Sequence, residues 1–298
     1  MSFAAMKSRL QANGAADYSK KVEDALGGSG GYKKDDRYWN LTVNKSGVGQ
    51  AIIRFMPEPE GEEMPIVKIL EHSFYVPNGD KKDWYIEKSR ATLGEPDYAT
   101  DWANEHRNSS DASLKELAKK RSPSSKYVSN VYIVSDPANP ANEGKVMLFK
   151  YGAAIKKMLE SGLKPEFDGD PIVNAFDPFA GGANFALRAY NGDNGMRTYD
   201  KSKFESAKPL FDSDAKIEAV WQQCHSLKAE IAPEKFKDYE TLKKRYIQVC
   251  KLQSPQSANT QSTAVHGQTT QSQQFTQQSQ MPANTDSSID EYQALLGD

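Results

Sequence analysis

A run of cations leads directly into a strand-like stretch that carries tyrosines. Lys119-Lys120-Arg121 is followed, after a short polar segment, by Lys126-Tyr127 at the start of a predicted strand over residues 127–134. Cations replace the counterions along a phosphate backbone, and aromatic rings offer faces on which unstacked bases can lie. These two types of side chain together predict contact with single-stranded nucleic acid. The alternative at this segment is a solvated loop before an ordinary strand.

Aromatic residues continue through the segments that follow. Several alternate with cations, as in Phe149-Lys150-Tyr151 and in residues 197–201. Half-buried tyrosines are common in β-structure, so packing is the competing interpretation for each ring. Tyrosine beside lysine or arginine is nevertheless the combination that a base-stacking groove needs. The rings in these predicted strands and loops are Tyr85, Tyr98, Tyr127, Tyr132, Phe149, Tyr151, Tyr190 and Tyr199.

Side chains that could catalyse a reaction are sparse. The 4 histidines are scattered, and neither an HExxH motif nor a nucleophile elbow occurs. Asp168 and Asp170, with Asp177 close by, could hold a magnesium ion for a nuclease. The first two flank Gly169 between two prolines, however, which is typical of a turn. We therefore expect no enzyme; the alternative is a metal-dependent nuclease that uses these three aspartates.

Composition excludes several classes of protein. Hydrophobic residues make up 38% of the 298 residues, enough for a core, yet no run approaches the roughly 18 apolar residues of a membrane helix. The first residues lack the apolar run of a secretory signal, so we expect a cytoplasmic protein with no membrane contact. The two cysteines, Cys224 and Cys250, exclude a disulfide scaffold and a CxxC metal site. We expect both in the core, and no cofactor.

Charge is distributed unevenly along the chain. The formal net charge is −2, yet from Gln253 onward there is no lysine or arginine. Four acids, Asp286, Asp290, Glu291 and Asp298, give this tail a charge of −4, which leaves +2 for the rest of the chain. A mildly basic body with an acidic end is one arrangement found in nucleic-acid binders.

The tail itself has two compositions. Residues 253–285 are rich in Gln, Ser and Thr and nearly free of large apolar side chains, which predicts a disordered linker. Residues 286–298 mix acids with isoleucine, tyrosine and leucine. Such a tip is either an inert solubilising end or a peptide that docks on partner proteins, and composition leaves both open.

Ahead of the tail we expect a folded body over residues 32–252, preceded over residues 1–31 by an arm and a glycine-rich joint. Alternation and turn residues predict three hairpins in its first half, and apolar spacing predicts two later helices. The pattern indicates an α+β fold in which helices pack on a β-barrel or sandwich. The expected hairpins pair residues 38–44 with 50–56, 65–76 with 84–88, and 126–135 with 145–152. The expected helices bury Ile217, Val220, Cys224, Leu227 and Ile231 in the first, and follow Pro233 in the second.

Five stretches, taken in order, carry a resemblance to a known family. They begin at Gly49-Gln50-Ala51-Ile52-Ile53-Arg54-Phe55-Met56-Pro57 and Trp84-Tyr85-Ile86-Glu87, and continue through residues 136–146, 182–185 and 199–204. The ordered set resembles the single-stranded DNA-binding, or helix-destabilising, proteins of T-even bacteriophages. The resemblance spans residues 38 to about 250, and the acidic, apolar ending fits it.

The resemblance implies both a fold and a function. The fold is an OB-fold β-barrel core with a small subdomain and C-terminal packing helices, flanked by an N-terminal arm and a disordered acidic tail. The function is sequence-independent, cooperative coating of single-stranded DNA in phage replication, recombination and repair, in the host cytoplasm. The arm would bind the neighbouring protomer, and the tail would recruit phage replication and recombination proteins. A third interpretation is a protein-interaction adaptor in which the tail alone is active.

Residue roles follow by position from the resemblance, together with the cation and ring pattern. The expected self-association residues are Lys7, Ser8 and Arg9. The expected partner-binding residues are Asp290, Glu291, Leu295 and Leu296. The expected DNA contacts are Arg54, Tyr98, Lys119, Lys120, Arg121, Lys126, Tyr127, Phe149, Tyr151, Tyr199 and Lys201.

One departure from the family concerns a metal. The resemblance implies a structural zinc ion held by one histidine and three cysteines. His72 stands at the histidine position, but Ser89 stands where the first cysteine belongs, and residues 95–104 contain no cysteine. Structural zinc favours thiolate and imidazole ligands, so we predict that the metal has been lost. Packing by Trp84 and Trp102 would then hold the subdomain; the alternative is a residual site that uses His72 and His106.

Overall fold

The structure, a computed structural model, describes residues 35–193 and 195–252. The chain divides into two compact units, residues 1–37 and 38–298, and the account below concerns the second. The predictions for the arm and the tail lie outside the described residues. Those predictions concern Lys7, Ser8, Arg9, Asp290, Glu291, Leu295 and Leu296.

The described part of this unit is α+β, with nine strands in one sheet and five α-helices. The strands are β1 (Tyr38–Trp39), β2 (Gly49–Phe55), β3 (Val67–Asn78), β4 (Lys81–Lys88), β5 (Ser124–Ser135), β6 (Val146–Tyr151), β7 (Phe185–Asn191), β8 (Arg197–Thr198) and β9 (Lys203–Phe204). The helices are α3 (Tyr98–His106), α4 (Ala112–Arg121), α5 (Ala153–Leu163), α6 (Asp214–Trp221) and α7 (Tyr239–Cys250).

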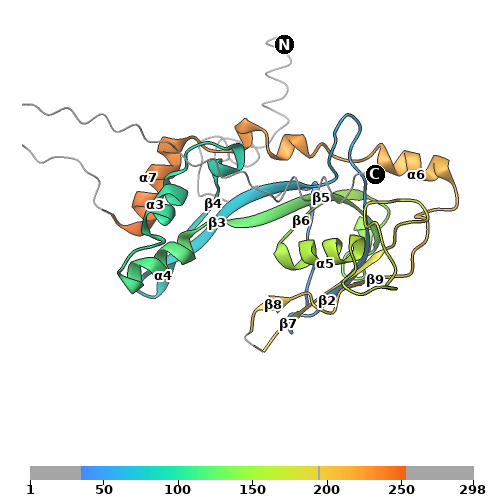
Figure 1. Cartoon of the computed structure of the whole chain (residues 1–298), viewed down its shortest axis with the longest axis horizontal. Coiled ribbons are helices and arrows are strands. Elements are labelled where there is room, and N and C mark those ends of the chain that lie inside the picture. Colours follow the sequence, from blue (N-terminus) through green and yellow to red (C-terminus); the bar gives the residue numbers. More distant parts are fainter. Residues whose placement is uncertain (1–34, 194, 253–298) are drawn as a thin grey trace, which may run out of the picture. The chain divides into compact units, whose positions relative to one another are not determined.

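Strand β5 organises the sheet. One edge pairs with β6, while the other edge pairs first with β3 and then, further along, with β2. Figure 1 shows β3 and β5 running together from the core toward α3, α4 and α7. The main path runs β1-β6-β5-β2-β7-β8, and no pairing among the described strands joins its two ends. The described strands therefore do not form the barrel that the sequence predicts. On one edge, β5 pairs with β3 over its first half and with β2 over its second half, so its two halves have different neighbours.

Two of the three predicted hairpins are confirmed. Strands β3 and β4 pair antiparallel, with Glu71 opposite Lys88 at one end and Asn78 opposite Lys81 beside the turn. Strand β5 likewise pairs antiparallel with β6. The first predicted hairpin is wrong. Its turn forms, since Asn44 and Val48 share a backbone hydrogen bond, but β1 leaves to pair parallel with β6 and β2 pairs with β5 and β7.

The first predicted helix ends earlier than its apolar spacing indicates. Helix α6 stops at Trp221, and the side chain of Asn130 on β5 bonds both the backbone N–H and the carbonyl of His225. Those two groups are therefore not available to a helical ladder. Leu227 is still buried, against Ile69, Val128 and Leu148, so the apolar residues pack on the sheet without forming one helix.

The second predicted helix begins later than expected. Pro233 opens only a short 3-10 turn, and α7 begins after Asp238, whose carboxylate accepts the backbone N–H of Thr241 as an N-cap. The apolar face of α7 is confirmed, since Leu242, Tyr246 and Val249 are all buried.

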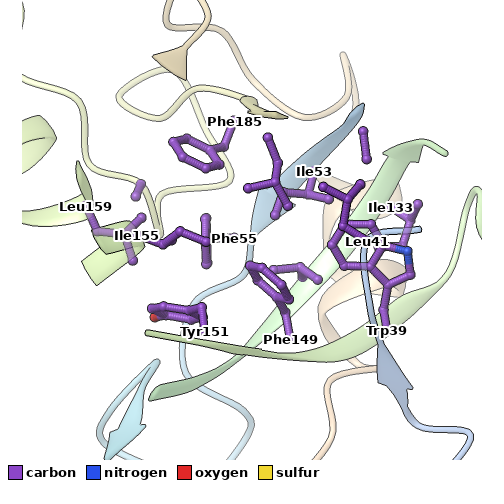
Figure 2. Packing of buried hydrophobic residues seen from close by; sticks show 14 of the residues in the cluster. Trp39, Leu41, Ile53, Phe55, Ile133, Phe149, Tyr151, Ile155, Leu159 and Phe185 are labelled. Atoms are coloured by element: carbon purple, nitrogen blue, oxygen red, sulfur yellow. The ribbon is translucent and has the colours of Figure 1, made fainter. Parts of the chain in front are cut away.

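The main core lies on one face of the sheet and is dominated by aromatic rings. Phe55 is fully buried, and the centre of its ring lies within 6.4 Å of the ring centres of Phe149, Tyr151, Phe176 and Phe185. Figure 2 shows Phe55 together with Phe149, Tyr151 and Phe185 in this core. Trp39 closes one end, where its Nε1 donates to Asp136 Oδ2 at 2.9 Å. Edge-to-face contacts of this kind add to the burial of apolar area, so the core fixes β2, β5, β6 and β7 together.

A second cluster forms what we call the hairpin lobe: β3, β4, α3, α4 and α7. Phe74, Tyr85 and Tyr246 form its centre, with Val249 and Ala99 buried beside them. Burial strongly raises the pKa of the Tyr85 and Tyr246 hydroxyls, so both stay neutral. The lobe is thus a small core of its own, joined to the sheet through β3.

The cysteines are half-buried free thiols that pack against separate clusters. Burial raises the pKa of Cys224 to about 12 and also raises that of Cys250, so both are unreactive thiols at neutral pH. Within the described residues, no helix is long and apolar enough to cross a membrane.

Candidate nucleic-acid interface

Tyr127 lies at the point where the aromatic core reaches the surface. It is half-buried, and in the β5–β6 register it lies opposite Tyr151, with the two rings stacked 6.0 Å apart. Lys156 on α5 places its ammonium group 6.0 Å from the Tyr127 ring centre. Stacking on Tyr151 fixes the plane of the ring, so Tyr127 is a preorganised aromatic face with a cation beside it.

A pocket of about 290 Å³ opens beside this ring. Met64, Ile66 and Ile231 line it together with Tyr127, and Lys156 and Lys228 stand among its walls. Its shape depends on Glu62, whose carboxylate accepts the backbone N–H groups of Leu227 and Lys228 and the hydroxyl of Ser226. Glu63 also lines the pocket and Lys156 is ion-paired with Glu160, so its walls combine apolar groups, an aromatic ring and charges of both signs.

The predicted basic loop proves to be the last turn of a helix. Lys119 and Lys120 are exposed at the C-terminal end of α4, where the helix dipole favours positive charge. The chain then enters β5, where Lys126 precedes Tyr127 and is half-buried. Successive strand residues point to opposite faces, so Lys126 and Tyr127 do not share a face of the sheet.

Arg121 is not available to DNA in this structure. It is 7% exposed, Nη1 donates to the Tyr246 hydroxyl at 2.8 Å, and its guanidinium lies 4.6 Å from the Trp102 ring centre. A guanidinium held by cation–π contacts and a hydrogen bond is a packing element of the hairpin lobe. The structure thus places this guanidinium in packing contacts inside the lobe, away from the surface.

Arg54 is likewise buried. It is 0% exposed, and its Nη2 donates to the backbone carbonyls of Asp177, Phe179 and Lys208 at 2.9, 3.2 and 2.9 Å. Burial lowers the pKa of Arg54 to about 10, partly opposed by the charge of Asp177. Arg54 therefore clamps two loops to β2, and nothing in this arrangement directs it to a phosphate.

Two predicted ring contacts also belong to packing, whereas the third, Tyr98, is only half-buried, as Tyr127 is. Phe149 and Tyr151 are 5% and 4% exposed and lie in the main core, where the Tyr151 hydroxyl bonds that of Ser129. Tyr98 is half-buried in the hairpin lobe, with its ring 5.3 Å from Tyr246. Because the Tyr151 ring stacks against that of Tyr127, Tyr151 contributes to the surface indirectly by orienting Tyr127.

The remaining predicted contacts lie near β8. Tyr199 is half-buried against the main core, the same cluster that Tyr127 contacts, and Lys201 is exposed. Lys201 places its ammonium group 4.1 Å from the ring centre of Tyr190, whose hydroxyl donates to Asp200. Hydrogen bonding to Asp200 raises the pKa of Tyr190. This is a second exposed pairing of ring and cation.

Some surface groups could not be found from the sequence. Lys156 and Lys228 lie in a helix and a 3-10 turn whose neighbouring residues carry no aromatic signal, so only the fold brings them to Tyr127. Trp84 is 44% exposed and pairs with Tyr75 across the β3–β4 hairpin at 5.1 Å. Its expected role in packing the subdomain is wrong, because strand alternation turns Tyr85 inward instead. Trp102 does pack in the lobe as expected.

The groups considered for metal chemistry do not assemble. Among the described residues, no group of three or more His, Cys, Asp and Glu side chains is placed to hold a metal ion. Asp168 and Asp170 lie in a turn, and the Asp177 carboxylate accepts the backbone N–H of Phe179. His106 stacks on Trp102 and bonds its carbonyl, so it does not join His72 in a residual site.

Comparison with known proteins decides the family. The model of the family described as "gp32 DNA binding protein like" matches residues 47–250, more than half of the chain. The chain belongs to this gp32-like family. A single-stranded DNA-binding protein of Enterobacteria phage T2 is 30% identical over 241 residues, covering 78% of this chain and 77% of the relative. The protein of the same name in Enterobacteria phage T4 is 31% identical over 231 residues, covering 75% and 74%. A shorter relative from Escherichia phage SV14 is 34% identical over 83 residues, 28% of this chain and 70% of that relative.

The gp32-like match covers the hairpin lobe and every described strand of the sheet except β1. It runs from the turn before β2 to the last residue of α7, so every element that carries Tyr127, Lys119 and Lys120 lies inside it. The resemblance inferred from the sequence is thereby confirmed at the level of the family.

Proposed function

We propose that this protein binds single-stranded DNA without sequence preference and coats it, as a non-enzymatic protein acting in the cytoplasm of an infected host. The observation that carries the proposal is Tyr127, a half-buried ring stacked on Tyr151, with Lys156 above it and an apolar pocket beside it. The names of the T2 and T4 relatives support the same ligand.

The proposed interface is narrower than the sequence indicated. It comprises Tyr127 with its pocket, Lys119 and Lys120 at the end of α4, Lys126, and the Tyr199–Lys201 segment. Arg54, Arg121, Phe149 and Tyr151 support the surface by packing rather than by contact, and half-buried Tyr98 stays a predicted contact. Stacking on a ring is worth about 1–3 kcal/mol per base, and each phosphate contact adds a salt-dependent contribution.

Further parts of the proposal rest on the family. They are an OB-type arrangement of the sheet, cooperative contacts between protomers through Lys7, Ser8 and Arg9, and recruitment of replication and recombination proteins by Asp290, Glu291, Leu295 and Leu296. Together these would suit a protein that protects DNA exposed during phage replication, recombination and repair. All of these tail and arm residues lie outside the described ranges.

A titration of full-length protein with a dT oligonucleotide at two salt concentrations tests the proposal. We expect binding that weakens as salt rises, because cations on the protein displace counterions from the phosphates. Equal affinity for single- and double-stranded DNA, or no binding at low salt, would contradict it. Incubating a labelled oligonucleotide with magnesium addresses the nuclease alternative, which requires cleavage that Asp168→Asn and Asp170→Asn abolish.

A further inference from the structure

Three segments of the hairpin lobe meet at one buried polar cluster, which we call the His72 knot: His72, Ser89, Asp97 and Thr100. His72 comes from β3, Ser89 follows β4, and Asp97 and Thr100 begin α3. His72 and Ser89 are 0% exposed and Asp97 is 1% exposed. Such groups are tolerated in an apolar lobe only when hydrogen bonds satisfy them.

The hydrogen bonds of the knot are continuous. His72 Nε2 lies 3.0 Å from Asp97 Oδ1 and 3.1 Å from Thr100 Oγ1, and that hydroxyl lies 3.0 Å from Ser89 Oγ. Asp97 Oδ1 also accepts the backbone N–H of Thr100, and Oδ2 accepts that of Arg90. Burial alone would raise the pKa of Asp97, but hydrogen bonds from His72 and Thr100 outweigh it and hold the pKa below its ordinary value.

These residues do not fit the zinc ion that the family resemblance implies. The knot offers one imidazole, one carboxylate and two neutral hydroxyls, whereas structural zinc is held by thiolates and imidazoles. His72 Nδ1 donates to the carbonyl oxygen of Arg121 at 2.8 Å, an arrangement that metal-bound histidines also adopt, so only Nε2 bears on metal binding. Nε2 lies against one carboxylate oxygen and one hydroxyl, and the knot contains no thiolate to complete a structural zinc site.

The bond to Arg121 connects the knot to the proposed interface. Arg121 is the last residue of α4, immediately after Lys119 and Lys120. A buried ring that holds this carbonyl fixes where the basic end of the helix lies relative to β3 and β5. We propose that the His72 knot holds the hairpin lobe without a metal ion and positions Lys119 and Lys120 for DNA; the second half rests on the proposed function.

Elemental analysis and melting test the first half. Full-length protein purified without added zinc should contain much less than one equivalent, and a chelator should leave its Tm unchanged. His72→Gln should lower the Tm by roughly 5 °C or more, because it breaks a buried network. His106→Gln, the same substitution on α3 outside the knot, removes only a half-buried stacking contact with Trp102 and should lower the Tm clearly less. Stoichiometric zinc with a chelator-sensitive Tm would overturn the metal-free assignment, as would an unaltered Tm in both His72→Gln and Asp97→Asn.

Salt-dependent binding of a dT oligonucleotide tests the second half, at a temperature where every variant is folded by circular dichroism. Lys119→Ala/Lys120→Ala should flatten the slope of log K against log salt by roughly 0.7 for each phosphate that the protein no longer neutralises. His72→Gln should flatten it similarly, and the combined variant should flatten it little more, since both changes act on the same phosphates. If the slope flattens in the lysine variant but not in His72→Gln, the positioning role is overturned. If it flattens in neither variant, the basic end of α4 is not a DNA contact and the positioning role is overturned with it.

Discussion

At the scale of single residues, aromatic side chains divide into those that hold the fold and those that can meet a ligand. Tyr127 and Phe149 lie on neighbouring strands, yet Phe149 is enclosed by Trp39, Phe55 and Tyr151 while Tyr127 is half-buried with a pocket beside it. The sequence places both in similar settings next to lysines. Only the burial of each ring distinguishes their roles.

Tyr127→Ala should weaken binding of a dT oligonucleotide by about 1–3 kcal/mol, a factor of roughly 5 to 150, because the ring on which a base stacks is removed. Tyr127→Phe keeps the ring and should bind nearly as well. Fluorescence titration of the three proteins measures the difference. Phe149→Ala serves as the contrast: it should lower the free energy of unfolding by about 3–5 kcal/mol through a core cavity. Normal DNA binding by Tyr127→Ala would remove this ring from the interface.

Arg54 supports a second prediction at this scale. Arg54→Ala should lower the free energy of unfolding by about 3 kcal/mol or more, because the carbonyls of Asp177, Phe179 and Lys208 would be left without their charged donor. Urea unfolding measures the change. The salt slope of DNA binding by the folded variant should match that of the unaltered protein. A flatter slope in a fully stable variant would instead restore the phosphate contact that the sequence suggested.

At the scale of elements, the sequence could predict what depends on neighbouring residues. The turn residues 78–80 and the alternation around Trp84 predict the β3–β4 hairpin. The Pro/Asn/Gly-rich loop between residues 135 and 145 predicts the β5–β6 hairpin. Helix α7 followed from its apolar spacing. These elements form wherever a local pattern and its turn agree.

Elements that depend on distant partners were not predictable in this way. The first predicted hairpin does not form, because Trp39 bonds to Asp136 and β1 pairs with β6. The first predicted helix ends early, because the Asn130 side chain binds the backbone N–H and carbonyl of His225. The contacts of Arg54 also depend on residues far away in the sequence. Gly182 lies so close to the Asp177 carbonyl oxygen, which Arg54 binds, that a Cβ at this position would collide with it. Two stretches that carry the family resemblance, around Arg54 and Gly182, thus meet for a packing reason that neither reveals alone.

The end of α4 provides the prediction at this scale. Lys119→Ala/Lys120→Ala should weaken binding to all single-stranded sequences alike, since phosphates carry no sequence information. The matched control is Lys216→Ala, an exposed lysine of α6 at the other end of the fold (Figure 1). Titrations of dT and dA oligonucleotides measure the effect. A weakening confined to one sequence, or an equal weakening in the control, would contradict a local phosphate contact.

At the scale of the whole molecule, charge separates the body from the tail. The described body carries the proposed interface, while residues 253–298 carry four acids and no cation. A charged peptide attached to the same chain stays at a high local concentration, so even weak attraction to Lys119, Lys120 and Lys201 can compete with DNA. Such competition is screened by salt, because the Debye length falls from about 30 Å at 0.01 M to about 10 Å at 0.1 M.

Truncation after Leu252 should therefore tighten or speed DNA binding, and the gain should be largest at low ionic strength. Changing Asp286, Asp290 and Asp298 to Asn and Glu291 to Gln in the full chain removes the charge but keeps the length. If charge causes the competition, this variant should bind DNA as the truncated protein does, and stopped-flow titration at 0.01 and 0.1 M salt would compare the two. Only the truncation removes Leu295 and Leu296, so only it should abolish capture of a partner that recognises the apolar side chains of the tip. Identical DNA binding by all three proteins at low salt would leave the tail with docking, or solubility, as its only role.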